Sequence, residues 1–218
     1  MYRVKEAFYT LQGEGAQAGR AAVFCRFSKC NLWNGREKDR AGSVCDFCDT
    51  DFVGTDGQNG GRFDTAAVLA EHIRQLWPAG LGRPYVVCTG GEPLLQLDAP
   101  LIDAFHAAGF EVGVETNGTL PAPAGIDWLC VSPKADAEVV ITRCNELKLV
   151  YPQPLALPER FAAMDADHFF LSPMASPAVP DDGDDPIKRS NTRRATDYCL
   201  ANPQWRLTLQ MHKIVGID

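Results

Sequence analysis

The segment CRFSKCNLWNGREKDRAGSVCDFCDT, residues 25–50, decides the fold, because three of its cysteines have the spacing of a metal or cluster site. Cys30, Cys45 and Cys48 follow the pattern C-x14-C-x2-C, and the last two are close enough to bind one metal centre from a single turn. A structural zinc ion takes four protein ligands, whereas a 4Fe-4S cluster bound by three thiolates leaves one iron free. The number of ligands therefore decides the chemistry.

Cys25 is the candidate for a fourth ligand, and with it the pattern becomes similar to that of a zinc ribbon. The surrounding segment AAVFCRFSKC alternates like a half-buried strand, so Val23, Cys25 and Phe27 share one face. Free cysteine in such an apolar row is commonly a small buried hydrophobe. The residues favour three ligands over four and leave a zinc module with Cys25 as the alternative.

A second motif, YVVCTGGEP over residues 85–93, is a hydrophobic strand that runs directly into two glycines and a carboxylate. Gly90 and Gly91 let backbone groups approach a ligand closely, and the Glu92 carboxylate can bind an ammonium group. Together with the three cysteines, this motif makes the sequence resemble the radical S-adenosylmethionine (SAM) superfamily. That resemblance implies that the open iron chelates the methionine moiety of SAM and that GGEP helps hold its amino group.

The cluster loop departs from the superfamily's usual C-x3-C-x2-C, and its expansion resembles one subgroup, the 7-carboxy-7-deazaguanine synthases of the queuosine and deazapurine pathway. The motifs that carry this resemblance come in the family's order: LQGEG, CRF-x2-C, CDFCDT, TGGEP, VETNGT, SPK, NELKLV and QMHK. The resemblance implies a carbon–nitrogen lyase that converts 6-carboxy-5,6,7,8-tetrahydropterin to 7-carboxy-7-deazaguanine and ammonia. It also implies a 4Fe-4S cluster, SAM and Mg2+ as cofactors, a flavodoxin-like or ferredoxin-like electron donor, and a homodimer.

The same resemblance implies roles for individual residues, with Cys30, Cys45 and Cys48 as the cluster ligands and Thr50 beside Mg2+. The residues implied to contact SAM are Phe47, Asp49, Gly90, Gly91, Glu92, Glu115, Asn117, Ser132, Lys134, Lys148, Ser172 and Met174. The residues implied to contact the substrate are Leu11, Gln12, Gly13, Glu14, Arg26, Thr89, His212 and Asp218. No side chain is assigned as a catalytic acid or base, because the cofactor carries the radical chemistry.

Several of these residues also have an ordinary structural interpretation. Gln12 and Glu14 suit a solvated turn, Arg26 suits a surface cation on the polar face of its strand, and Lys134 suits a solvated lysine. Lys148 alternates with two leucines along its strand, so it is expected to point into the barrel. It is a weaker candidate for a contact to SAM.

Length and composition indicate one globular domain, residues 1–218. A hydrophobic content of 45% with 22% charged residues is ordinary for soluble proteins, and a net charge of −7 argues against a broad nucleic-acid surface. The substrate is therefore expected to be a small molecule. The sequence shows no export signal and no apolar run of about eighteen residues that could span a membrane. Of eight cysteines only three suit one cluster, which indicates a reducing cytoplasm.

Apolar strands that end in polar residues alternate with helical stretches, which predicts an α/β fold with its site at the carboxyl ends of parallel strands. The chain is short for eight complete units, so we expect a partial, open barrel of about six mainly parallel strands with an inserted cluster-binding lobe at about residues 30–62. The link from Val114 to Trp128 is too short and Pro-rich for a full helix. Expected strands include 4–11, 84–89, 110–119, 128–134 and 145–150, and expected helices are 64–77, capped by Asp64, then 96–108 and 186–201; a strand and a short tail close the chain.

A further rival is another radical enzyme, an activase that makes a glycyl radical on a protein. A protein substrate predicts an open mouth to the active site. The LQGEG segment, Arg26 and the QMHK segment predict a closed polar pocket instead.

Overall fold

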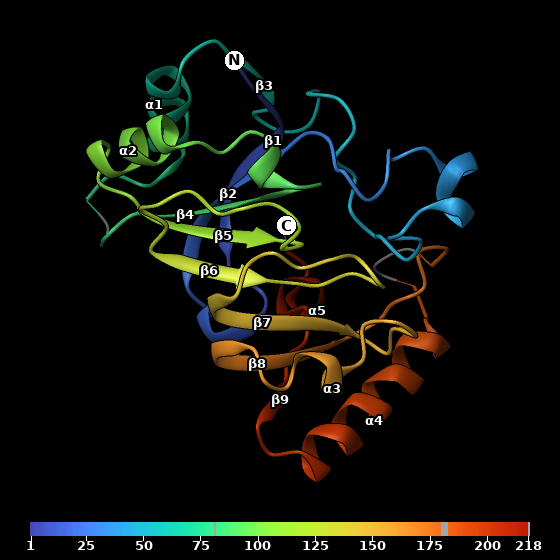
Figure 1. Ribbon diagram of the computed structural model, residues 1–218. Helices are drawn as coiled ribbons and strands as arrows, with labels where there is room; N and C mark the ends of the chain where they lie inside the picture. The colour runs from blue at the N-terminus through green and yellow to red at the C-terminus, as the bar shows by residue number, and fades with distance from the viewer. Residues whose placement is uncertain (81, 180–182, 218) are drawn as a thin grey trace.

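The computed structural model describes residues 1–80, 82–179 and 183–217, whose strands form one nine-stranded sheet (Figure 1). Its order is β3-β1-β2-β4-β5-β6-β7-β8-β9. Neighbours from β2 onward are parallel, and β1 is antiparallel to both β2 and β3. The strands are β1 (Tyr2–Leu11), β2 (Ala21–Phe27), β3 (Gly61–Phe63), β4 (Tyr85–Gly90), β5 (Glu111–Thr116), β6 (Trp128–Val131), β7 (Arg143–Tyr151), β8 (Asp165–Pro173) and β9 (Trp205–Leu207).

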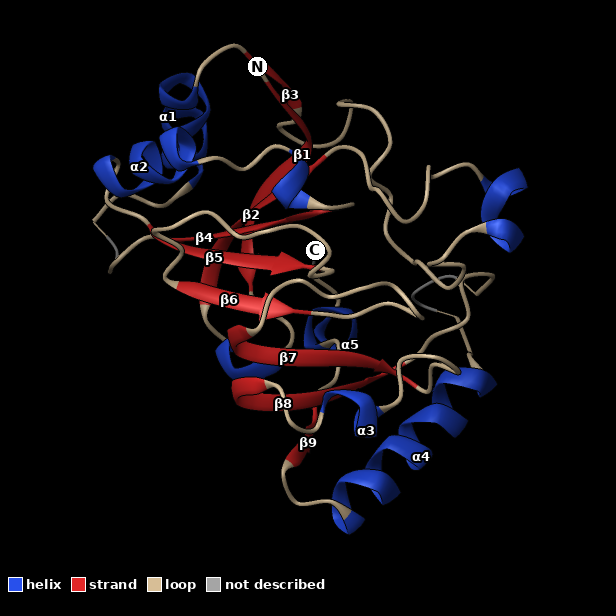
Figure 2. Cartoon of the chain, in the orientation of Figure 1, coloured by secondary structure: helices blue, strands red, loops and turns tan. Residues whose placement is uncertain are grey.

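The longer helices lie along the outside of this sheet, and the short helix near the C-terminus lies behind its central strands in this view (Figure 2). The α-helices are α1 (Ala66–Leu76), α2 (Ala99–Ala107), α3 (Pro158–Phe161), α4 (Pro186–Ala201) and α5 (Met211–Val215), and the 3-10 helices are η1 (Gly15–Gln17), η2 (Glu37–Gly42) and η3 (Pro93–Leu95). Between β5 and β6 the chain is not helical, as the short Pro-rich link predicts. Within the described ranges, no helix is long and apolar enough to cross a membrane.

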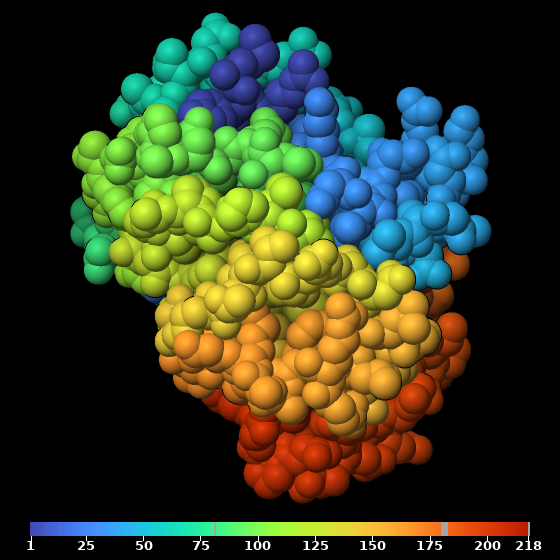
Figure 3. All heavy atoms as spheres, viewed as in Figure 1, coloured from blue at the N-terminus to red at the C-terminus, as the bar shows by residue number. Residues whose placement is uncertain are grey.

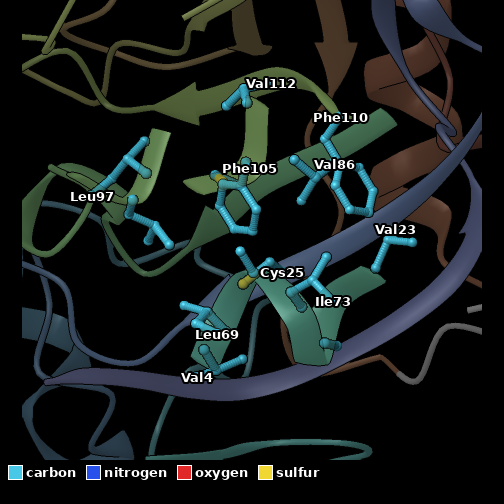
Figure 4. Close-up of a cluster of buried hydrophobic side chains, with 14 of the residues drawn as sticks. Val4, Val23, Cys25, Leu69, Ile73, Val86, Leu97, Phe105, Phe110 and Val112 are labelled. Atoms are coloured by element: carbon cyan, nitrogen blue, oxygen red, sulfur yellow. The ribbon is translucent and has the colours of Figure 1, made fainter. Parts of the chain in front are cut away.

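One hydrophobic core fills the space between the first half of the sheet and helices α1 and α2 (Figure 4). Leu69 and Ile73 of α1 and Phe105 of α2 are fully buried there. Cys25 of β2 lies among them with 0% of its surface exposed. Each such apolar side chain contributes about 1.5–3 kcal/mol by leaving water. The expected role of Cys25 as a buried hydrophobe is therefore what the fold requires.

A second core joins the other half of the sheet to α3 and α4. Leu147 and Leu149 of β7 are fully buried in this core, together with Leu171 of β8 and Ala195 of α4. Because side chains alternate along a strand, the residues between these leucines face the opposite, inner side of the sheet. That alternation directs Lys148 into the barrel, as its position between two leucines predicts.

The fold class is confirmed: the chain forms an open, mainly parallel α/β barrel, although the sheet has nine strands where about six were expected. The short strand β3 was not expected, whereas β1 and β9 correspond to the expected strand at 4–11 and the expected closing strand. The cap of α1 also differs from expectation, because Thr65, and not Asp64, accepts a hydrogen bond from the amide of Val68 at 3.3 Å. The chain closes with the helix α5 after β9, where a tail was expected.

The cluster loop projects from the body of the molecule (light blue in Figure 3). It contains one irregular helical stretch, η2, and returns to the sheet through β3. Lys5 of β1 holds the returning segment with ion pairs to Asp51 and Asp56, each at 2.9 Å. Asn59 donates to the carbonyl of Ala7 at 2.9 Å. These contacts attach the lobe to the first strand and orient its cysteines toward the barrel.

Candidate active site

A cavity of about 640 Å3 lies at the carboxyl ends of the parallel strands and is covered by the cluster loop. Most of the predicted site residues line it. They are Cys30, Cys45, Cys48, Thr50, Phe47, Asp49, Gly90, Gly91, Glu115, Asn117, Ser132, Lys134, Lys148, Ser172, Met174, Leu11, Gln12, Glu14, Arg26, Thr89 and His212. Gly13 and Glu92 are not part of the wall, and Asp218 lies outside the described residues.

The three cysteines of the C-x14-C-x2-C pattern meet at one side of this cavity. The amide of Leu32 donates to the sulfur of Cys30 at 3.4 Å, which favours a thiolate there, although burial raises the pKa of Cys30 overall. A hydrogen bond from Cys45 lowers the pKa of Cys48 to about 7 and raises that of Cys45. The three thiols are free, as are the other five.

This arrangement suits a cluster better than a single metal ion. Within the described ranges, no group of three metal-ligating side chains is spaced for one ion. Three thiolates are enough to hold a 4Fe-4S cluster, whereas a structural zinc ion takes four protein ligands. Cys25 faces the opposite side of its strand, in the core, and cannot complete a zinc site. The buried indole nitrogen of Trp33, on the cavity wall, has no hydrogen-bond partner among the described residues, and cluster sulfur accepts such donors.

Arg40 supports the cysteine segment, and sequence reasoning did not assign it a role. Its guanidinium donates to the carbonyls of Asp46 and Cys48, both at 2.9 Å, and stacks 4.2 Å above the ring of Trp33. The planar fork of arginine suits this combination of two carbonyl acceptors and an aromatic face. The sequence feature that could have indicated this role is the position of the arginine in the loop whose turn carries Cys45 and Cys48.

The TGGEP turn packs directly on the segment that carries the first cysteine. Gly91 donates to the carbonyl of Phe27 at 3.2 Å, and the amide of Glu92 donates to the carbonyl of Lys29 at 2.9 Å. A Cβ atom at Gly91 would lie 2.2 Å from that Lys29 oxygen and 2.8 Å from the Cβ of Cys30. Glycine is therefore required here for the close approach of two backbones.

The Glu92 carboxylate is fully buried, with 0% exposure, and accepts three hydrogen bonds. Its donors are the hydroxyl of Thr116 at 2.7 Å, the amide of Asn117 at 2.8 Å and the amide of Leu94 at 2.9 Å. Burial nevertheless raises its pKa above the usual value for glutamate. The carboxylate thus ties the GGEP turn to the end of β5, directly behind the residues that line the cavity.

An ion triad forms the floor of the cavity. The ammonium of Lys148 lies 2.6 Å from a carboxylate oxygen of Glu14 and 3.3 Å from one of Glu115, and Gln12 donates to the same Glu115 oxygen at 3.0 Å. Burial by itself would lower the pKa of the Lys148 ammonium and raise that of the Glu115 carboxyl. Even so, the two carboxylates raise the pKa of Lys148 well above its usual value, and Lys148 with Gln12 lowers that of Glu115.

The LQGEG segment is anchored from two further directions. Glu146 accepts from the amide of Ala16 at 2.8 Å, and Thr208 accepts from the amide of Gly15 at 2.8 Å. Burial raises the pKa of Glu146. These bonds hold the backbone of residues 13–16 against β7 and against the chain after β9, so the loop has little freedom to move away from the cavity.

On the opposite wall, Arg26 of β2 pairs with Glu6 of β1 at 2.8 Å and neighbours Thr89 of β4 in the sheet register. Lys134 bends back to the Ser132 carbonyl at 2.7 Å and to its hydroxyl at 2.6 Å. Both sites therefore present charged groups that are already held in place by the protein. Glu6 was not anticipated, although its alternation with Phe8 along β1 directs both toward the cavity.

The C-terminal segment supplies the remaining wall. His212 packs so closely on Gly13 that a Cβ there would lie 1.9 Å from its Nδ1 atom. Lys213 forms an ion pair with Asp49 at 3.0 Å, next to Cys48 and Thr50. Lys213 and Gln210 both belong to the QMHK motif, whose segment was expected to close the pocket, although neither residue was assigned a contact of its own.

Comparisons with known proteins agree with this geometry. A family model described as the radical SAM superfamily matches residues 41–149. The chain is 61% identical over 216 residues to the 7-carboxy-7-deazaguanine synthase of Caulobacter vibrioides and 62% identical to that of Bordetella pertussis, with 99% of each chain covered. The crystal structure of QueE from Escherichia coli is similar with a TM-score of 0.67 and 27% identity, covering 97% of this chain and 94% of that one.

Proposed function

The chain belongs to the 7-carboxy-7-deazaguanine synthase family of radical SAM enzymes, and from this premise we propose that it converts 6-carboxy-5,6,7,8-tetrahydropterin to 7-carboxy-7-deazaguanine and ammonia. The observation that carries the proposal is one cavity that combines three cysteines with the polar floor made by the LQGEG segment and the barrel strands. The product name belongs to the curated relatives, and the substrate follows from the chemistry of that family.

When bound, the cluster and SAM supply a 5'-deoxyadenosyl radical that removes a hydrogen atom from C6 of the substrate. The residues that would hold the cluster are Cys30, Cys45 and Cys48. We assign the SAM-contacting side to the strand ends that carry Gly90, Asn117, Ser132, Lys134, Ser172 and Met174, with Phe47 beside the cluster. Glu92 belongs to the same side, where its carboxylate, bonded to three donors, also holds the turn that carries Gly90 and Gly91.

The charged groups of the cavity suggest how the substrate is oriented. Arg26 can meet the substrate carboxylate, since its guanidinium has donors left beyond the one bonded to Glu6. Gln12 and Glu14 offer acceptors to the N–H groups of the pterin ring on the floor of the cavity. Because Lys148 balances only one of the two carboxylates beside it, this floor favours a ligand that donates hydrogen bonds.

We also propose Mg2+ at Thr50. Mg2+ prefers oxygen ligands and completes its shell with substrate oxygens and water. Thr50 lies on the cavity wall, and its sequence neighbours Asp49 and Asp51 line the same wall. The ion would orient the substrate and steer the rearrangement. Its removal by chelation and return in a titration, followed by product formation, tests this assignment.

Two partners complete the proposal. An external flavodoxin-like or ferredoxin-like protein would supply the electron, and the free state of all eight cysteines suits the reducing cytoplasm in which such donors work. A homodimer would cover part of the apolar surface of α5, where Ile214 is 65% and Val215 59% exposed. Sedimentation of the wild type and of a variant with both residues changed to serine tests the dimer.

The deciding experiment is mass spectrometry of an anaerobic reaction that contains reconstituted protein, SAM, a reductant, Mg2+ and 6-carboxytetrahydropterin. We expect 7-carboxy-7-deazaguanine together with 5'-deoxyadenosine. If 5'-deoxyadenosine forms without that product, the substrate assignment is wrong. The rival activase predicts a cavity open to a protein segment, whereas here the C-terminal segment and the LQGEG segment close one side of it.

A further inference from the structure

The barrel is open between its first and last strands, and the C-terminal segment crosses that opening. Beyond β9, the amide of Thr208 still pairs with the carbonyl of Leu171 in β8 at 3.0 Å. The hydroxyl of Thr208 then accepts from Gly15, and the amide of Met211 donates to the carbonyl of Gly13 at 3.0 Å. The chain after the last strand is thereby joined to the loop after the first strand. This segment replaces the wall that a closed barrel would have made from strands.

The same segment is attached to the cluster loop through one carboxylate. The ammonium of Lys213 lies 3.0 Å from an oxygen of Asp49, and Gln210 donates to that same oxygen at 3.3 Å. Gln210 is itself held by Lys188 of α4 at 3.3 Å. The side chain of Lys213 is 13% exposed and that of Asp49 is 38% exposed. The contact is therefore partly shielded from water, which makes it stronger than an ion pair on the open surface.

Asp49 stands between Cys48, a proposed cluster ligand, and Thr50, the proposed Mg2+ ligand. Its backbone neighbour Cys48 is already fixed by Arg40. A side-chain bond from Asp49 to the C-terminal segment therefore joins two rigid parts: the cysteine turn and the wall that carries His212. Both parts line the cavity. Losing the bond would remove this link between the wall and the cluster loop and leave the cysteine turn in place.

We propose that Lys213 and Asp49 are positioning residues that hold the C-terminal wall closed against the cluster loop, so that substrate is retained and water is excluded during the radical reaction. Neither residue needs to touch the reacting atoms for this role. The proposal deepens the function proposed above and rests on it for its catalytic consequence. Its structural consequence, closure of residues 208–217 by this ion pair, does not depend on the identity of the substrate.

A double-mutant cycle tests the pair: Lys213→Met, Asp49→Asn and the two together, in the reconstituted holoenzyme. Hydrogen exchange of the amides in residues 211–217, followed by mass spectrometry, reports closure directly. We expect each single variant to speed exchange about fivefold, the size typical of one partly exposed ion pair, and the double variant to match the singles. Lys213→Arg should restore slow exchange. A matched control pair is Arg143→Met and Asp167→Asn, which removes an ion pair at the amino ends of the strands.

Kinetics supply the second readout. We expect both single variants to raise KM for the substrate and the yield of 5'-deoxyadenosine per product, with little change in iron content. If exchange stays unchanged in both singles, the closure role is wrong whatever the activity. If only Lys213→Met impairs the enzyme while Asp49→Asn does not, the lysine contacts the substrate directly and the positioning role is overturned. A substrate other than the pterin would remove the kinetic effect and leave the exchange effect intact.

Discussion

Replacement of Lys148 by methionine should destabilise the protein strongly at neutral pH. Lys148 is buried between two carboxylates, at 2.6 Å from Glu14 and 3.3 Å from Glu115. At an effective dielectric constant of about 20, these distances correspond to attractions of about 6 and about 5 kcal/mol. The cost of burying the ammonium offsets much of this, and removal of one partner from a buried ion pair typically costs about 3–5 kcal/mol. We expect a loss of that size in the free energy of unfolding at pH 7.

The same variant should recover stability as the pH falls. In the wild type the folded pKa of Glu115 lies below its unfolded value, so its contribution is present at neutral pH and is lost as the pH falls through the folded pKa. Without Lys148, burial dominates and places the folded pKa above the unfolded value. Glu115 then costs stability at pH 7, and this cost disappears as it takes up a proton. The difference between wild type and variant should therefore shrink between pH 7 and about pH 5.

Urea unfolding of the cluster-free protein, followed by circular dichroism at the two pH values, measures both effects. The double variant Lys148→Met with Glu115→Gln should regain part of the loss, because one of the two uncompensated carboxylates is gone. Lys38→Met, the same change on an exposed lysine, serves as the control and should alter stability by less than about 0.5 kcal/mol. A Lys148→Met protein within about 1 kcal/mol of wild type at pH 7, or equally destabilised at both pH values, would refute the triad as an energetic unit.

Four further changes test the cluster loop and the turn that supports it. Cys45→Ser should abolish iron binding after reconstitution. Cys25→Ser should keep the iron and lower the free energy of unfolding by about 1–3 kcal/mol, because it buries a hydroxyl in the core. Loss of iron in Cys25→Ser would reopen the four-ligand alternative. Gly91→Ala should reduce iron content although it alters no ligand, since its Cβ meets the backbone just before Cys30; normal iron content would contradict the close packing. Glu92→Gln should lower the free energy of unfolding by about 1–3 kcal/mol, because the NH2 group of glutamine would face one of the buried donors that now bond to the carboxylate. Thermal or urea unfolding measures this, and a neutral effect would show that the three hydrogen bonds are dispensable.

Local patterns in the sequence predicted much of the site. Cysteine spacing singled out three cysteines that the fold brings to one cavity, and strand ends with polar residues identified the edge of the sheet where the cavity lies, because side chains at the carboxyl ends of parallel strands converge. Period-two alternation directed Cys25 into the core and Arg26 into the cavity, and both directions are what the sheet displays. Motif order added the roles that spacing alone left open, such as those of Gln12 and Ser132.

Pairings between distant residues were decided only by the tertiary structure. The strand order brings β5 beside β4, and donors at the end of β5 bond to the Glu92 carboxylate. Lys213 and Asp49 are 164 residues apart, and no local period relates them.

The sequence by itself determined which residues are buried, which strands carry polar ends and which cysteines form the candidate cluster motif, because these follow from periodicity and short spacing. The tertiary structure decided which polar side chains pair with one another and which remain free for a ligand. The physical reason is that a charged group in a low-dielectric cavity must pair with an opposite charge or a hydrogen-bond partner. The strand register and the path of the C-terminal segment across the barrel opening decide which partner is close enough.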